Sequence, residues 1–160
     1  MERNLQEALV QFDRAIQFGF VDADVYAERG SCLQLLNFDL EAIEDFDAAI
    51  AFDPTDSNLY FMRATSKGSI GDLHGCVSDL QEAIRVAGID NAANRSHNTH
   101  AQEQGYEDIS SYYRMRLLGA EMDLEDQAAD EIRLKGPGAS LGPDLASRRR
   151  AKARRRGDGA

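Results

Sequence analysis

The stretch EAIEDFDAAI at residues 41–50 decides the fold, because it recurs at the same distance on both sides. Thirty-four residues earlier, residues 7–16 read EALVQFDRAI, and thirty-four residues later, residues 75–84 read GCVSDLQEAI. Five positions of each copy hold small or apolar residues, at successive spacings of one, three, three and one. On an α-helix this spacing places the five side chains on one face. The sequence therefore predicts three amphipathic helices with a period of 34 residues.

A second pattern precedes two of these helices at the same period. Tyr26 recurs as Tyr60, and Arg29 recurs as Arg63. Pro54 then follows the helix predicted at 41–50 and prevents it from running on, since the residue before a proline disfavours helical geometry. Each full period is thus expected to contain two helices.

The combined pattern resembles the tetratricopeptide repeat, a family with a 34-residue period. In the first full copy the positions typical of that family are Tyr26, Gly30, Ala42, Phe46 and Pro54. The resemblance covers residues 5 to about 90 and implies an all-α fold, an α-α superhelix of antiparallel helix pairs. It assigns a half repeat to residues 1–22 and full repeats to 23–56 and 57–90. Small residues at Gly30 and Ala64 are expected to let the paired helices approach closely.

The rest of the chain is predicted from pattern alone. Residues 91–105 are polar and without clear period, which indicates a loop. Residues 106–134 carry apolar side chains three and four positions apart, which predicts a C-terminal helix that caps the last hairpin. Residues 135–160 offer almost nothing to bury and are expected to form a disordered basic tail. The half repeat lacks its partner helix, so a neighbouring chain or a longer array is expected to cover it.

In the tetratricopeptide family the first helix of each pair lines a concave groove that holds peptides. Carried over position by position, the groove residues here are Asp24, Ala27, Glu28, Ser31, Gln34, Leu35, Asn58, Phe61, Met62, Thr65 and Ser69. Phe61 and Met62 have two interpretations. They are either exposed anchors for a partner, because aromatic and methionine side chains bury much area, or they are covered by the C-terminal helix or the 91–105 segment.

The groove composition also indicates the kind of ligand. One subclass of the family clamps a terminal carboxylate with Lys, Asn and Arg, whereas the corresponding positions here are Ala27, Ser31, Asn58 and Met62, with neither Lys nor Arg. That ligand is therefore disfavoured. Asp24 and Glu28 in the groove instead favour a peptide with basic and apolar residues, through complementary charge.

Charge divides the chain into two parts. Residues 1–134 hold 10 Lys/Arg and 26 Asp/Glu, a net charge of −16, and residues 135–160 hold eight Lys/Arg and two Asp, a net charge of +6. Seven of the basic residues form one run: Arg148, Arg149, Arg150, Lys152, Arg154, Arg155 and Arg156. Such a run is either a solvated tail or a contact to an acidic surface, to nucleic-acid phosphates or to a nuclear-import receptor.

Other function classes find little support in the sequence. No apolar run is long enough to span a membrane and no signal peptide opens the chain, so a cytoplasmic location is predicted, with a nuclear one possible through the basic tail. Cys32 and Cys76 are expected to be packed side chains. His97 and His100 lack further ligands for a metal. No catalytic centre and no cofactor are predicted.

The sequence thus predicts a non-catalytic protein–protein interaction module whose concave groove binds a partner peptide or helix. The alternative is a structural subunit or fragment of a larger assembly, which docks or self-associates through its half repeat while the basic tail contacts an acidic surface.

Overall fold

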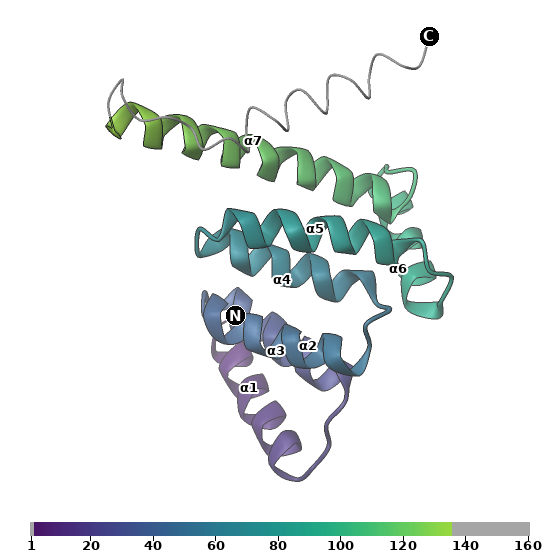
Figure 1. The fold of residues 1–160 in the computed structure, drawn as a ribbon. Coiled ribbons are helices and arrows are strands. Elements are labelled where there is room, and N and C mark those ends of the chain that lie inside the picture. Colours follow the sequence, from purple (N-terminus) through teal and green to yellow (C-terminus); the bar gives the residue numbers. More distant parts are fainter. Residues whose placement is uncertain (1, 136–160) are drawn as a thin grey trace. The chain divides into compact units, whose positions relative to one another are not determined.

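The computed structural model describes residues 2–135, and within them the chain forms seven α-helices and no β-strand (Figure 1). In chain order these are α1 (Glu2–Gln17), α2 (Ala23–Leu35), α3 (Asp39–Phe52), α4 (Ser57–Ser69), α5 (Leu73–Ala87), α6 (Ala92–Glu103) and α7 (Ile109–Lys135). The predicted all-α class is confirmed. The predicted basic tail, with all seven residues of its basic run, lies outside the described residues. Within the described range, no helix combines the length and the apolar character that a membrane crossing requires.

Acidic side chains fix where several helices begin. The carboxylates of Asp22, Asp56 and Asp72 accept hydrogen bonds from backbone N–H groups in the first turns of α2, α4 and α5, at 2.8, 2.8 and 2.9 Å. Such caps satisfy backbone donors that have no partner inside the helix. The repeat therefore encodes helix starts as well as apolar faces.

Consecutive helices pack as the repeat pattern predicts, α2 on α3 and α4 on α5, and α3 lies against α4 (Figure 1). Gly30 is buried on α2, and a Cβ atom at this position would lie 2.9 Å from the ring of Phe46. Only glycine therefore allows α2 to approach α3 at this point. In the second pair the smaller Leu80 packs in a buried cluster with Ala64 and Cys76.

An arginine on α2 joins three helices. Arg29 donates two hydrogen bonds to Asp45 of α3, from Nε to Oδ2 at 2.8 Å and from Nη2 to Oδ1 at 2.6 Å. Its remaining terminal nitrogen, Nη1, bonds Oδ1 of Asp13 on α1 at 2.8 Å. Asp45 is only 4% exposed, so its charge depends on this two-pronged partner. Arg29 thus fastens its own hairpin and also the helix of the preceding repeat.

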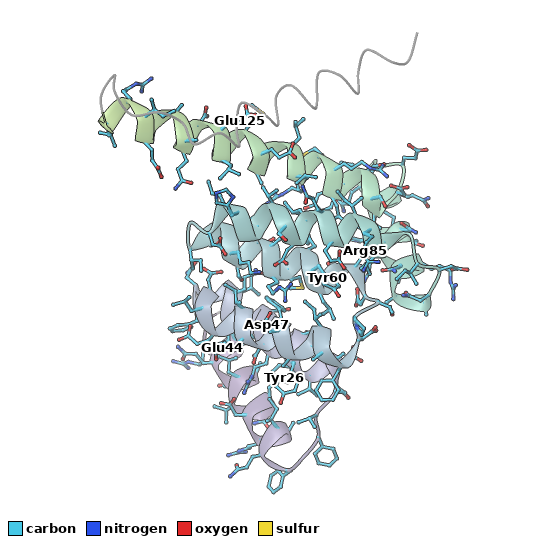
Figure 2. All side chains as sticks on the ribbon, in the orientation of Figure 1. Tyr26, Glu44, Asp47, Tyr60, Arg85 and Glu125 are labelled. Atoms are coloured by element: carbon cyan, nitrogen blue, oxygen red, sulfur yellow. The ribbon has the colours of Figure 1, made fainter. Side chains whose placement is uncertain are left out.

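The second full repeat reproduces this arrangement 34 residues later. Arg63 of α4 holds Asp79 of α5 at 2.8 and 2.7 Å and reaches back to Asp47 of α3 at 2.5 Å. Lys67 adds a second cation to Asp79, 2.9 Å from Oδ2. Asp47 is labelled on α3 in Figure 2. We call the two arginines and their four aspartates the ion-pair ladder, because each arginine joins successive repeats.

The prediction of a loop at residues 91–105 is wrong, because most of this segment forms helix α6. Asn91 accepts a hydrogen bond from the backbone N–H of Asn94 at 2.8 Å and so caps the helix. The turn after α6 also follows the repeat: Gly105 has φ 89°, as Gly71 one period earlier has φ 82°. The prediction failed because α6 buries only Asn94 and Ala101, so it has no apolar stripe for periodicity to detect.

Asn94 explains how so polar a helix is held in place. Its Oδ1 accepts from the backbone N–H of Ser57 at 3.1 Å, and its Nδ2 donates to the carbonyls of Thr55, Val86 and Ile89 at 3.0–3.1 Å. The side chain is 1% exposed. It therefore joins α6 to the start of α4 and to the end of α5.

Replacing Asn94 by alanine is expected to lower the free energy of unfolding by about 2–3 kcal/mol, because several buried backbone groups lose their partner. Urea denaturation followed by far-UV circular dichroism measures this loss. Ser96→Ala, an exposed change on the same helix, should stay within about 0.5 kcal/mol of the wild type. Equal effects of the two substitutions would contradict a structural role for the Asn94 side chain.

Candidate peptide-binding face

Helices α2 and α4 meet along a seam of polar and sulfur-containing side chains. Gln34 of α2 donates to the carbonyl of Met62 at 3.1 Å and to Oγ of Ser66 at 2.8 Å. The Met62 sulfur lies 3.4 Å from Nδ2 of Asn58 and 3.9 Å from Oγ of Ser31. These contacts place the half-buried Met62 side chain of α4 beside α2. We call Ser31, Gln34, Asn58 and Met62 the α2–α4 seam.

The remaining predicted groove residues lie beside this seam or apart from it. Asp24, Glu28 and Leu35 are exposed on α2, and Leu35 keeps 68% of its surface. Ala27 is half-buried on the same helix. On α4, Phe61, Thr65 and Ser69 line a different hollow, toward α5 and α7. The structure therefore brings Ser31, Gln34, Asn58 and Met62 together, whereas Thr65 and Ser69 lie on another surface.

Phe61 is covered by α7, which is one of the two interpretations of this residue from sequence. Its ring stacks on Tyr113 with centroids 5.1 Å apart and meets Tyr112 at 5.3 Å. The guanidinium of Arg116 lies 5.9 Å from the same ring. Tyr113 is fully buried, and this burial raises the pKa of its hydroxyl. Phe61 thus supports the attachment of α7, whereas Met62 stays at the seam.

A hollow of about 410 Å³ continues from the seam toward α6 and the start of α7. Asn58 belongs to both the seam and the hollow. The other lining side chains are mostly aromatic or imidazole groups: Phe61, His97, His100, Tyr106, Tyr112 and Tyr113, with Ala101, Gln104 and Ile109. A concave surface that combines aromatic rings with polar groups is suited to holding an anchoring side chain.

A second, larger hollow of about 550 Å³ lies among α4, α5 and the first half of α7. Small side chains line much of it, among them Ala64, Gly68, Gly119 and Ala120. The Cys76 thiol also lines it, and burial raises the pKa of this thiol. Burial raises the pKa of Cys32 in the same way. Both free cysteines are therefore held as packed, protonated thiols, which agrees with the role expected for them.

The two histidines of α6 both line the 410 Å³ hollow, and they make different contacts. Nε2 of His97 lies 3.0 Å from Oδ1 of Asp56, and the same carboxylate caps α4. His100 is exposed near Glu103. Among residues 2–135, no three side chains of the His, Cys, Asp or Glu type come together in a way that would hold a metal ion.

Sequence reasoning missed the contribution of α6 and of the aromatic start of α7 to this face. Tyr106 meets Tyr112 edge-on with ring centroids 5.0 Å apart, and both rings line the hollow. The signal available in the sequence was Gly105, which lies one period after Gly71 and two periods after Asn37. All three have positive φ and mark the turn after the first helix of a pair.

Comparisons with known proteins support the fold. PcrH from Pseudomonas aeruginosa, solved in complex with the chaperone binding region of PopD, is 16% identical with a TM-score of 0.53, and the alignment covers 77% of this chain and 95% of PcrH. A structure of the MamA protein is 18% identical with a TM-score of 0.51, over 87% of this chain and 70% of MamA. No family model matches the sequence, and no curated protein matches it.

Proposed function

We propose that this chain, whose fold is the stacked helical-hairpin arrangement of tetratricopeptide-type proteins, is a non-catalytic module that binds a peptide of a partner protein. The observation that carries the proposal is the continuous surface formed by the α2–α4 seam and the 410 Å³ hollow beside it. PcrH, which has the same fold, is known in complex with a segment of another protein. A shared fold alone does not assign a ligand, so the ligand is argued from the surface itself.

The chemistry of this surface favours a peptide that combines apolar and basic residues. Met62 and the aromatic side chains of the hollow offer deformable and flat apolar contacts. Asp24 and Glu28 lie exposed on α2 and place negative charge beside the seam. Complementary charge steers and orients a ligand more than it adds affinity, so we assign anchoring to the apolar groups and orientation to the carboxylates.

The proposal is tested by selecting 15-residue peptides from a displayed random library against the full chain. We expect the selected peptides to be enriched in Lys or Arg together with Leu, Met or aromatic residues. The double variant Asp24→Lys, Glu28→Lys should weaken their binding about tenfold or more, measured by fluorescence anisotropy. Both positions are exposed, so the fold should be unaffected.

A matched control makes the same charge change elsewhere. Glu41→Lys, Glu44→Lys reverses two exposed carboxylates on α3, and Glu44 is labelled there in Figure 2. This variant should keep affinity within about twofold. Equal losses in the two double variants would show that only net charge matters, and the proposed face would then be wrong.

A further inference from the structure

The ion-pair ladder stops after the second full repeat. One period after the arginine–aspartate pair that joins α4 to α5, the chain carries His97 on α6 and Tyr113 on α7. Nε2 of His97 lies 3.0 Å from Oδ1 of Asp56. The hydroxyl of Tyr113 lies 3.5 Å from Oγ of Ser57. Both side chains thus contact the start of α4, and α6 and α7 lack the arginine–aspartate bridge of the first two helix pairs.

The 410 Å³ hollow opens at this position of the third repeat, and both His97 and Tyr113 line it. At the corresponding position of the second repeat, the guanidinium of Arg63 lies over the Tyr60 ring, 5.7 Å from its centroid. The same guanidinium donates two hydrogen bonds to Asp79. The third repeat therefore replaces a charged, hydrogen-bonded pair by two ring side chains, and the hollow lies beside them.

The lining of the hollow favours an uncharged occupant. Among the described residues, the side chains that line it include no Lys, Arg, Asp or Glu. A charged group that entered the hollow would lose water without gaining an oppositely charged partner, which costs free energy. Asn58 and Gln104 contribute neutral amide groups, which suit a hydroxyl group or an indole N–H.

The aromatic side chains of the lining favour a ring as the occupant. Four of them contact one another with ring centroids 5.0–5.9 Å apart: Phe61, Tyr106, Tyr112 and Tyr113. A further ring gains contacts of the same kind, because offset and edge-to-face ring pairs stabilise beyond the area that they bury. The hollow is therefore suited to a neutral aromatic residue of the partner.

The positions of the helices set the distance between this aromatic residue and the basic residues of the peptide. Helix α4 contacts both α2 and α6, and side chains of α4 and α6 line the hollow. With neighbouring helix axes about 8–10 Å apart, the hollow and the carboxylates of α2 are separated by roughly 12–20 Å. An extended peptide covers this distance in about four to six residues. A helix needs about eight to thirteen residues, a length at which isolated helices are marginal in water.

We propose that the partner peptide inserts a neutral aromatic residue into the 410 Å³ hollow. The peptide crosses α4 in an extended conformation and places its basic residues beside Asp24 and Glu28, about four to six positions from the aromatic residue. This inference rests on the peptide-binding function proposed above and names the residue class that the hollow recognises.

The test uses the tightest-binding peptide from the displayed library, labelled with fluorescein and titrated with the full-length chain while anisotropy is recorded. We expect an aromatic residue about four to six positions from the nearest Lys or Arg of the peptide. Replacing this aromatic residue by arginine, which gives the arginine peptide, should weaken binding about tenfold or more. Inserting a Gly-Gly pair between the aromatic residue and the nearest basic residue should weaken binding about fivefold or more.

A charge introduced into the hollow shows whether the aromatic residue binds there. Gln104 is exposed at the end of α6 and lines the hollow, so Gln104→Glu adds a carboxylate at that place. The affinity of the arginine peptide relative to that of the selected peptide should rise about fivefold or more in this variant. Gln6→Glu makes the same change at an exposed position of α1 and should leave this ratio within about twofold.

The inference is overturned if the selected peptides lack an aromatic residue, if their spacing is that of a helix, or if arginine replaces the aromatic residue without loss. It is also overturned if the two glutamate variants shift the affinity ratio equally. In each of these cases peptides still bind, so the peptide-binding function stands. That function fails instead if no peptide is selected, or if the charge reversal of Asp24 and Glu28 leaves binding unchanged.

Discussion

Arg29→Met is expected to lower the free energy of unfolding by about 3–5 kcal/mol, since it leaves a buried carboxylate without its cation. Asp45 is 4% exposed and receives both of its short hydrogen bonds from Arg29. Methionine keeps much of the apolar stem of arginine, so the measured loss reports mainly the charge. Urea denaturation followed by far-UV circular dichroism gives the value.

The second repeat provides an internal comparison for this prediction. Arg63→Met removes the equivalent arginine, but Asp79 keeps Lys67 at 2.9 Å. We therefore expect this variant to lose roughly half as much free energy of unfolding as Arg29→Met. Arg95→Met, at an exposed ion pair with Asp90, should cost less than about 1 kcal/mol. Equal losses for Arg29→Met and Arg63→Met would contradict the role given to Lys67.

Tyr113→Ala is the other substitution with a large expected effect, about 3–5 kcal/mol in the free energy of unfolding. Tyr113, near the start of α7, is fully buried and stacks on Phe61 of α4 with ring centroids 5.1 Å apart. Its removal leaves a cavity where α7 joins the hairpins. We expect the backbone amides of residues 109–123 to lose most of their protection in hydrogen exchange, while those of α2 and α3 keep theirs.

The matched control for this prediction removes only the hydroxyl group. Tyr113→Phe keeps the ring and loses one long contact to Oγ of Ser57, at 3.5 Å. It should cost less than about 1 kcal/mol. If the alanine variant unfolded α2 and α3 together with α7 in hydrogen exchange, α7 would be an integral part of one cooperative unit rather than a separately detachable cap.

The 34-residue period predicted the helix pairs and their close contacts because both depend on residues of fixed size at fixed spacing. Gly30 opposite Phe46 is the clearest example, since the side-chain sizes that this contact requires can be read directly from the sequence. The sequence alone showed only part of the ion-pair ladder, namely the recurrence of its residues. Asp13 recurs as Asp47 and Arg29 recurs as Arg63, yet their pairing joins residues 16 positions apart on different helices. Such pairing follows only once the stacking of the helices is known.

Helix α6 was missed, and the covering of Phe61 was left as one of two interpretations, for a different reason. α6 is held by the hydrogen bonds of Asn94 and not by an apolar stripe, so hydrophobic periodicity gave no signal for it. Phe61 and Met62 are adjacent in the chain and similar in character. Which of the two residues α7 covers depends on the position of the first turn of α7. That position is set by contacts such as the hydrogen bond from the Ile109 backbone N–H to Oδ1 of Asn98, at 3.0 Å.

Amide chemical shifts of the nitrogen-15-labelled chain, recorded during titration with a peptide selected from the displayed library, test the central claim most directly. The account predicts that the perturbed amides cluster on α2, α4 and α6, around Ser31, Asn58 and Met62. Perturbations confined to the exposed side of α3 and α5, or to α1 alone, would contradict it.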